Sequence, residues 1–369
     1  MSRGMGKWIA AALLCSACTE VELCYNAEHP HTLPLSIGFN WGEAAVEEKP
    51  DSMYMVFSRI INTRHYVYGV SSEGWEEEGE AVPEALSEEP QEESMRVEGG
   101  DYIVIAVNKN HEQVELLEAD DFQADNSIRL DSLRLQVKDI KTPDLPGFDT
   151  QKWNNLNPAY TYIANTGKLF SSVERWGIAA GTSIWMSPQP VTQHLTFRFS
   201  LNLEEETDVT VDRVACELSG VVNRISLSTG KISEDDNRHS ICFMAEKTED
   251  SEDLSPVYEG SVDVLGLFPN KSQASIYGAG IIQLSIAVSK GKESRIHTVR
   301  LNLINLLTPA NLVVPAEDMD GLVANPAIRE KTFDIGQLEV DFDHIMNGEG
   351  NGGTLQWVVI ENGGTDIEI

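Results

Sequence analysis

Residues 194–203 read HLTFRFSLNL, in which an apolar residue follows a polar one at every step. The apolar members are Leu195, Phe197, Phe199, Leu201 and Leu203. Side chains of a β-strand point alternately to its two faces, so this period of two predicts a strand with one face in a hydrophobic core. Residues 32–41 (TLPLSIGFNW) and 281–289 (IIQLSIAVS) repeat the pattern, which indicates strands in both halves of the chain.

Shorter strand-like runs fill most of the sequence between these three. They include SMYMVFSRII (52–61), DYIVIAV (101–107) and DVTVDRVACEL (208–218), and clusters of Gly, Asn, Asp and Pro separate them. A long amphipathic pattern is missing, and HEQVELLEADDF (111–122) allows at most a short helix. Alternating runs between turn residues are typical of antiparallel sandwiches. We therefore predict an all-β fold of two tandem antiparallel β-sandwich domains with little helix.

Two prolines mark the expected boundary between the domains. They lie in SPQPVTQ (187–193), and a proline lacks the N–H that a central strand needs. We expect an N-terminal domain over residues 32–190 and a C-terminal domain over residues 191–345. A Gly-rich tail follows over residues 346–369.

Within the N-terminal domain, residues 73–93 hold ten glutamates and two prolines and few aliphatic residues. Such a segment cannot bury enough apolar surface to become ordered, which predicts a solvated acidic loop. The alternative, a cation-binding segment, lacks the fixed ligand geometry of calcium sites.

The net charge of the whole chain is −32. A surface of this sign repels phosphate polyanions and anionic lipid headgroups, so nucleic acid is excluded as a partner.

The chain begins with the features of a secretory signal. Arg3 and Lys7 precede an apolar stretch over residues 8–14, which is shorter than the roughly 20 residues that span a bilayer. Small Ala17 stands before Cys18, and a cysteine in this place is typical of a bacterial lipobox. We therefore expect a signal peptide over residues 1–17.

The lipobox itself reads Cys15-Ser16-Ala17-Cys18, with a cysteine where leucine is usual. An ordinary secretory signal with an incidental cysteine is the alternative. With the lipobox, Cys18 is acylated, residues 18–31 form a lipidated linker, and the lipid attaches the chain to the outer membrane. Removal of Arg3 and Lys7 with the signal would take the net charge from −32 to −34.

Three cysteines then remain, Cys24, Cys216 and Cys242. Their odd number and wide spacing exclude a disulfide framework. Cys216 and Cys242 either pair across neighbouring strands or are small buried thiols.

Motifs of catalysis are missing from the sequence. It has no Gly-rich phosphate loop, no Gly-x-Ser-x-Gly elbow and no zinc-protease histidine pair. His29 and His31 have no obvious third ligand, and DMDG (318–321) resembles only half a calcium loop. We expect a protein that is not an enzyme, with no catalytic residue, no metal and no cofactor.

Two elements carry a resemblance to a known family. Leu23-Cys24-Tyr25 followed by His29-Pro30-His31 resembles the opening of fimbrillin-anchor-like lipoproteins of gut Bacteroidetes, relatives of the anchors and minor subunits of type V fimbriae. LSGVVNRI (218–225) is similar to a Ser-Gly-x-x-x-x-Ile strand in their second domain. The resemblance implies a cell-surface outer-membrane lipoprotein, a fimbrial shaft subunit as partner, and assembly by strand addition.

The tail contains a segment suited to such addition. TLQWVVI (354–360) is rich in β-branched and aromatic residues and has no charge and no proline. Unpaired, it would be prone to aggregation, so its backbone should find a partner in its own chain or in a neighbouring subunit. In the exchange hypothesis Leu355, Trp357 and Val359 enter one face of a sheet.

A surface glycan-binding lipoprotein is the alternative function. Exposed tryptophans can stack on sugar rings, and the candidates are Trp75, Trp153, Trp176 and Trp185. Ordinary core or rim positions for the same residues are the simpler expectation.

Overall fold

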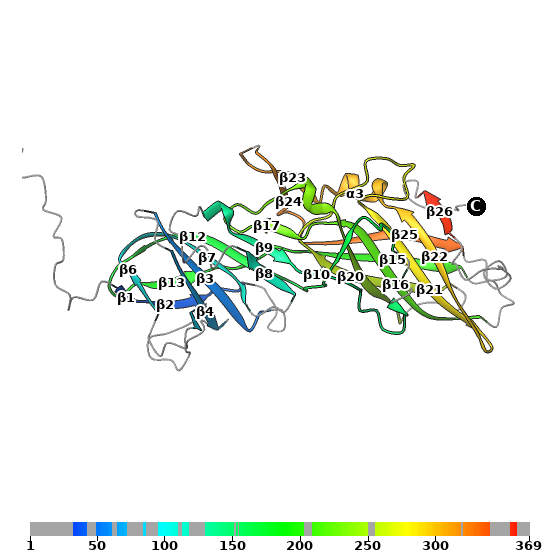
Figure 1. The fold of residues 1–369 in the computed structure, drawn as a ribbon, viewed down its shortest axis with the longest axis horizontal. Helices are drawn as coiled ribbons and strands as arrows, with labels where there is room; N and C mark the ends of the chain where they lie inside the picture. Colours follow the sequence, from blue (N-terminus) through cyan, green and yellow to red (C-terminus); the bar gives the residue numbers. More distant parts are fainter. Residues whose placement is uncertain are drawn as a thin grey trace, which may run out of the picture.

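The computed structural model describes residues 32–42, 49–60, 65–71, 84–85, 95–109, 113–117, 130–150, 153, 155–202, 209–249, 255–318, 320–339 and 355–359. Of these, 84–85, 131, 339 and 355–359 are described by their backbone alone. Strands dominate, and the prediction of an all-β sandwich fold with little helix is confirmed. The molecule is elongated, with the first strands at one end and the last strand, β26 (Leu355–Val359), at the other (Figure 1).

A six-stranded antiparallel sheet forms the centre of the N-terminal half. Its order is β14 (Gln189–Pro190), β12 (Phe170–Ile178), β7 (Gly100–Lys109), β3 (Ser52–Arg59), β4 (His65–Ser71) and β5 (Glu84–Ala85). The two-residue strand β5 lies inside the acidic segment 73–93 and is all of that segment that the structure describes.

Two strand pairs cover this sheet. They are the parallel pair β2 (Ser36–Phe39) with β13 (Ser183–Met186) and the antiparallel pair β1 (Thr32–Pro34) with β6 (Arg96–Glu98). The alternating residues Leu35 and Ile37 pack in one core with Phe57 and Tyr102, whose rings meet edge to face at 6.2 Å. The strand predicted at residues 32–41 thus buries its apolar face.

The C-terminal half is built on a ten-stranded sheet. Its main order is β25 (Glu330–Glu339), β15 (Gln193–Asn202), β20 (Val257–Val264), β19 (His239–Lys247), β16 (Val209–Val221), β21 (Ile281–Lys290), β22 (Glu293–Asn302) and β26. Most neighbours are antiparallel, but β25 runs parallel to β15 and β26 runs parallel to β22.

Strand β15 contains the stretch HLTFRFSLN and behaves as its period predicts. Leu195, Phe197, Phe199 and Leu201 are buried, and Phe197 stacks on Phe333 of β25 with ring centroids 5.5 Å apart. Full burial of such a side chain stabilises a fold by roughly 1.5–3 kcal/mol. The parallel β15–β25 pair is therefore a central part of the C-terminal core.

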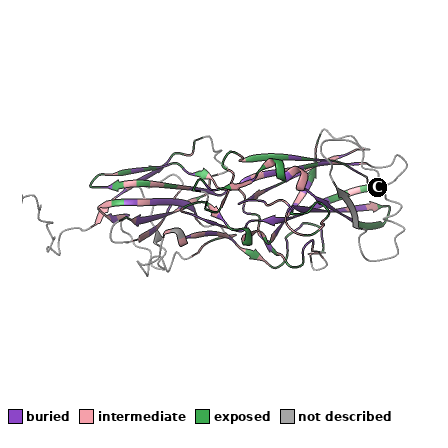
Figure 2. Ribbon diagram, turned by 90° about the horizontal axis from the view of Figure 1, so that it is seen from above, coloured by how far each residue is buried: buried purple, intermediate pink, exposed green. Residues whose placement is uncertain are grey.

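Strand β21 differs from the expectation because its polar face is buried too. Gln283 and Ser285 are as inaccessible as Leu284 between them. A chain segment from the other half of the sequence covers part of this face: Leu145 and Phe148 pack against Ala215, which lies opposite Ser285. Buried residues accordingly run along the strands of both halves (Figure 2).

Small elements join the two halves. Strands β8 (Val114–Leu117), β9 (Arg134–Val137) and β17 (Arg224–Ser226) form one antiparallel sheet, and β10 (Asp139–Ile140) and β11 (Thr161–Ile163) attach to β19. A second small sheet holds β18 (Lys231–Ile232), β24 (Leu322–Ala324) and β23 (Val313–Pro315). The division of domains at residue 190 stays a prediction.

Residues 111–122 allowed at most a short helix, and residues 114–117 within them form the strand β8. Pairing with β9 explains this, since tertiary contacts override a weak local preference. The described residues contain one α-helix, α3 (Ile304–Ala310), and the 3₁₀ turns η2 (Leu130–Ser132) and η4 (Glu234–Asn237).

The motif LSGVVNRI contains a bulge that only glycine permits. Gly220 has φ +89°, and a Cβ built on it would lie 2.5 Å from the Cβ of Ala279. The register of β16 with β19 shifts at this point, between Ser219 and Val221. The Ser219 hydroxyl donates to the carbonyl of Gly278 at 2.7 Å, so Ser-Gly fixes both the bulge and the loop beside it.

Candidate functional site

The last strand of the large sheet is the segment predicted to exchange. The backbone of β26 pairs with β22 in parallel, from Thr298 with Leu355 to Asn302 with Val359, and Trp357 lies opposite Arg300. On its other side, β22 pairs with β21 from Glu293 to Asn302. Strand β26 therefore covers half of an otherwise terminal edge, at the end of the molecule far from β1 (Figure 1).

The side chain of Arg300 on β22 is held by contacts with residues outside β26. The buried Arg300 donates from Nε to Oε1 of Gln283 at 2.9 Å, and its guanidinium lies 5.4 Å from the ring centroid of Tyr277. These contacts do not involve β26. The position opposite Trp357 is thus fixed before any strand is added.

At the other end of the edge, Asn302 ties β22 to a loop and to α3. Its Nδ2 donates to the carbonyls of Ser272 and Ser275 at 2.9 and 2.8 Å. Its Oδ1 accepts the N–H of Ile304, the first residue of α3, at 3.0 Å. The accepting edge of residues 298–302 is therefore preorganised.

Of the four tryptophans proposed for sugar stacking, Trp185 presents its ring to solvent. It is 59 % exposed on β13, directly opposite Gly38 of β2. A Cβ on Gly38 would lie 2.5 Å from the ring, so the indole rests on bare backbone and shields it. The outer face of the indole is free to bind another flat group.

The remaining three tryptophans are less suited to sugar stacking than Trp185. Trp176 is half-buried, and its indole nitrogen is buried with no hydrogen-bond partner among the described residues. Trp153 donates to the carboxylate of Glu217 at 3.0 Å and has a structural role. Trp75 lies outside the described residues.

The two cysteines of the C-terminal half are free thiols. Cys216 lies opposite Phe243 and faces the inner core, whereas Cys242 lies opposite Glu217 on the outer face. They sit on opposite faces of one sheet, which excludes a disulfide between them without rearrangement. Burial raises the pKa of both thiols, so both stay protonated.

The aspartates of the half calcium loop at residues 318–321 form ion pairs with a lysine of the same chain. The ammonium of Lys231 donates to Asp318 at 2.7 Å and lies 3.5 Å from Asp320. The hydrogen bond from Lys231 holds the pKa of Asp318 below its usual range.

The described residues contain no cluster of ligands suited to a metal ion. Among these residues, no helix is both apolar and long enough for a membrane span. Cys18, Cys24, His29 and His31 lie outside the described part of the chain.

Comparison with known proteins finds no matching family and no curated relative. Solved structures do match, among them a candidate adhesin from Bacteroides ovatus, with 12 % identity, a TM-score of 0.49, and coverage of 84 % of this chain and 93 % of the other. Another is the fimbrial anchor protein Mfa2 from Porphyromonas gingivalis, with 11 % identity, a TM-score of 0.40, and coverage of 83 % and 90 %.

A third match is a candidate polysaccharide-binding protein from Bacteroides thetaiotaomicron, with 11 % identity, a TM-score of 0.39, and coverage of 82 % and 90 %. These three matched structures come from species of Bacteroides and Porphyromonas.

Proposed function

We propose that this chain is a non-enzymatic cell-surface lipoprotein that acts as an anchor or minor subunit of a fimbrial or adhesive assembly. Acyl chains on Cys18 would hold it in the outer membrane, and a fimbrial shaft subunit would be its partner. The observation that carries the proposal is the parallel strand β26, which covers half of the terminal edge of the large sheet with five residues.

The physics of strand addition supports this assignment. Residues 298–302 of β22 offer backbone groups that β26 satisfies, and the same groups would pair with an equivalent strand of another subunit. Backbone hydrogen bonds give such pairing its affinity, and alternate side chains give it specificity. An edge fixed by Arg300 and Asn302 lowers the cost of ordering on binding.

The surroundings of the buried carboxylate favour a structural role over catalysis. Glu217 is fully buried and accepts hydrogen bonds from Trp153, Leu156 and Tyr162. Every one of these partners is a protein group, and a catalytic acid would need an approach for substrate. Within the described residues, Glu217 therefore fastens the fold.

Truncation after Gly353 tests the proposal, because it removes β26 and keeps all the other strands of both halves of the molecule. We expect a folded protein, with an unchanged β-type circular dichroism spectrum, that no longer copurifies with the fimbrial shaft from native cells. Truncation after Ile360, which keeps β26, is the matched control. Normal copurification of the shorter chain would exclude the tail as the contact.

One observation favours the second candidate, a surface glycan-binding lipoprotein. The ring of Trp185 is exposed and lies against Gly38, which leaves ring surface available for stacking on a sugar ring. Retardation in a gel that contains neutral polysaccharide would test it, with Trp185→Ala against Tyr277→Ala as a control at another exposed aromatic residue. Equal retardation of both variants would remove this candidate.

A further inference from the structure

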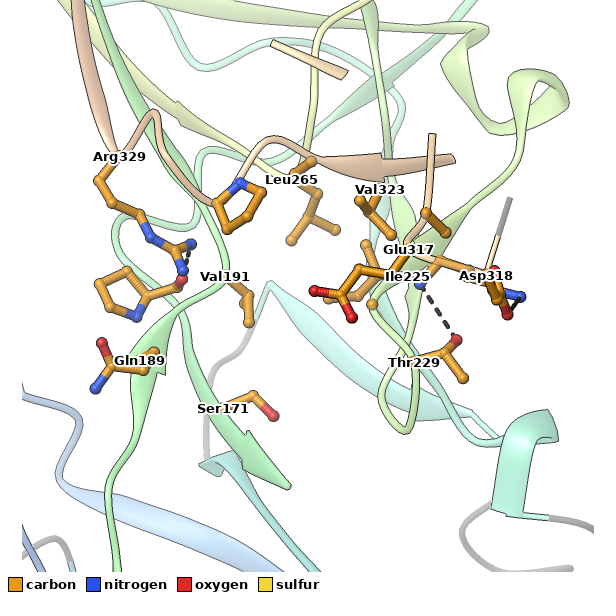
Figure 3. Close-up of a pocket in the computed structure, with 16 residues that line it drawn as sticks. Ser171, Gln189, Val191, Ile225, Thr229, Leu265, Glu317, Asp318, Val323 and Arg329 are labelled. Carbon is orange, nitrogen blue, oxygen red and sulfur yellow. Dashed lines mark hydrogen bonds and ion pairs between the residues drawn. The ribbon is translucent and has the colours of Figure 1, made fainter. Parts of the chain in front are cut away.

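A cavity of about 500 Å³ opens where the two halves of the molecule meet. Strands β12 and β14 border it on one side, and β18, β24 and the residues before β25 border it on the other. Its walls are mainly apolar, from Val191, Ile225, Leu265 and Val323 (Figure 3). A volume of this size is common for a ligand site.

Both cationic residues that line this cavity already have partners. Arg329 donates from Nη1 to the carbonyl of Pro190, and burial lowers the pKa of its guanidinium. Lys231 is held by Asp318 and Asp320, as described above. Neither of these two cations forms an ion pair with Glu317.

Glu317 is an exposed residue that lines the cavity, and its carboxylate points toward Val191 (Figure 3). No described residue forms a hydrogen bond or an ion pair with it. Arg329 lies on the opposite side of the cavity, with Val191 and Leu265 in the space between the two charged groups (Figure 3). The cavity thus combines an apolar middle, an unpaired carboxylate at one side and a cation at the other.

A carboxylate accepts hydrogen bonds only, and its strongest partners are guanidinium and ammonium groups. The apolar walls suit the methylene stem of such a group. Repulsion from Arg329 would direct the ligand's cation to the side of Glu317, and the net charge of −32 favours cationic ligands over anionic ones. We propose that this cavity binds a guanidinium or ammonium group on an apolar stem, as an arginine or lysine side chain carries it. The inference is independent of β26 and of strand addition.

Ligand-detected saturation-transfer NMR on the purified full chain tests the proposal. The probe is N-acetyl-arginine N-methylamide, and its neutral isostere N-acetyl-citrulline N-methylamide is the matched ligand. We expect the arginine probe to bind at least about tenfold more tightly, because a charge-assisted pair is lost in the citrulline probe. Equal binding of the two probes would overturn the proposal.

Variants locate the binding. Glu317→Gln should weaken the arginine probe about tenfold. Glu246→Gln, at an exposed glutamate of β19, should leave its affinity unchanged. Loss in both variants, or in neither, would show attraction to the acidic surface as a whole and would overturn the site.

Two further probes test two separate questions: whether the apolar stem contributes to binding, and whether the ligand belongs to a polypeptide or is a free compound. Methylguanidinium, which lacks the stem, should bind more weakly than the arginine probe, and equal affinity would overturn the role of the apolar walls. A capped Gly-Ser-Arg-Ser-Gly peptide that binds more tightly than the single residue would support a side chain of a partner polypeptide. Equal affinity would support a free guanidinium compound at the same site.

Discussion

The backbone N–H of Leu156 donates to both carboxylate oxygens of Glu217, at 3.1 and 3.2 Å, although 61 residues separate them. The indole of Trp153 and the hydroxyl of Tyr162 bind the same carboxylate at 3.0 and 3.1 Å. One buried side chain on β16 thereby holds a segment of the preceding half of the chain against the outer face of the C-terminal sheet. The contact links the two halves.

Replacement of that carboxylate should be costly. Glu217→Ala leaves the donors of Trp153, Leu156 and Tyr162 buried and without a partner, and we expect a loss of about 3 kcal/mol in the free energy of unfolding. Urea denaturation of the full chain would measure it. Glu246→Ala, at an exposed position, should change this free energy by less than about 0.5 kcal/mol. Equal effects of the two substitutions would contradict the fastening role.

The same residue predicts a pH dependence. Burial raises the pKa of Glu217 above its ordinary value of 4.5, while hydrogen bonds from Trp153, Leu156 and Tyr162 act in the opposite direction. The folded chain therefore holds this proton more tightly than the unfolded chain does. Its contribution to stability is complete below about pH 4.5 and is lost as the pH rises through the raised pKa of the folded state.

Comparison with a variant isolates this contribution from other carboxylates. The free energy of unfolding of the native chain minus that of Glu217→Gln should fall as the pH rises from below 4.5 toward neutrality. Urea titrations at several pH values would measure the difference. A difference that stays constant with pH would contradict the raised pKa.

The bulge of β16 supplies a matched pair of glycine variants. Gly220→Ala combines a positive φ with a Cβ 2.5 Å from Ala279, and we expect a loss of about 3 kcal/mol. Gly230→Ala has φ +67° but no heavy atom within 4 Å of the new Cβ, so strain alone should cost about 1 kcal/mol. Thermal unfolding would rank the two, and the reverse order would contradict the close packing at Gly220.

Lipidation of Cys18 is directly measurable. We expect cells fed a clickable fatty acid to label the native protein, and Cys18→Ala to lose the label and leave the membrane fraction, because the acyl chains provide the attachment. Cys24→Ala is the control at a neighbouring cysteine, and it should keep both the fatty-acid label and its place in the membrane fraction. Label and membrane retention in Cys18→Ala would mean that the lipobox is wrong.

Deletion of the acidic residues 73–83 and 86–93, with Glu84 and Ala85 kept within a Gly-Ser linker, tests the loop prediction. The entropy of closing a loop changes slowly with its length, so stability should change by about 1 kcal/mol or less. Scanning calorimetry would measure it. A drop of tens of degrees in the melting temperature would show that the glutamates are structural.

Sequence reasoning recovers the strands whose partners impose a simple alternation. Leu195 to Leu201 is such a case, since one face meets a core and the other does not. It fails where a distant segment covers the second face, as beside Ser285, because the neighbouring Ala215 packs against Leu145 and Phe148. The sequence held one indication that the outer face is covered. It is the glutamate in the strand-like run DVTVDRVACEL, because a glutamate is unusual among the apolar neighbours of a strand.

The cavity at Glu317 could not be predicted from the sequence either. Its walls come from β12, β17 and the approach to β25, which only the folded chain brings together. The sequence did single out residues 318–321, but only as half a calcium loop whose remaining ligands are missing. The structure shows that a lysine occupies that position instead.

The parallel register of β15 and β25 determines how the C-terminal half would respond to tension. The first half of the chain enters β15 at its N-terminal end, and the chain leaves β25 at its C-terminal end, so a pull along the molecule draws the two strands past each other. All the pairs from His194–Glu330 to Asn202–Glu339 are then loaded in shear at once, instead of opening one after another like a zipper. Rupture under force follows the unfolding barrier, so a force applied between these two strand ends has to break the whole set of pairs together.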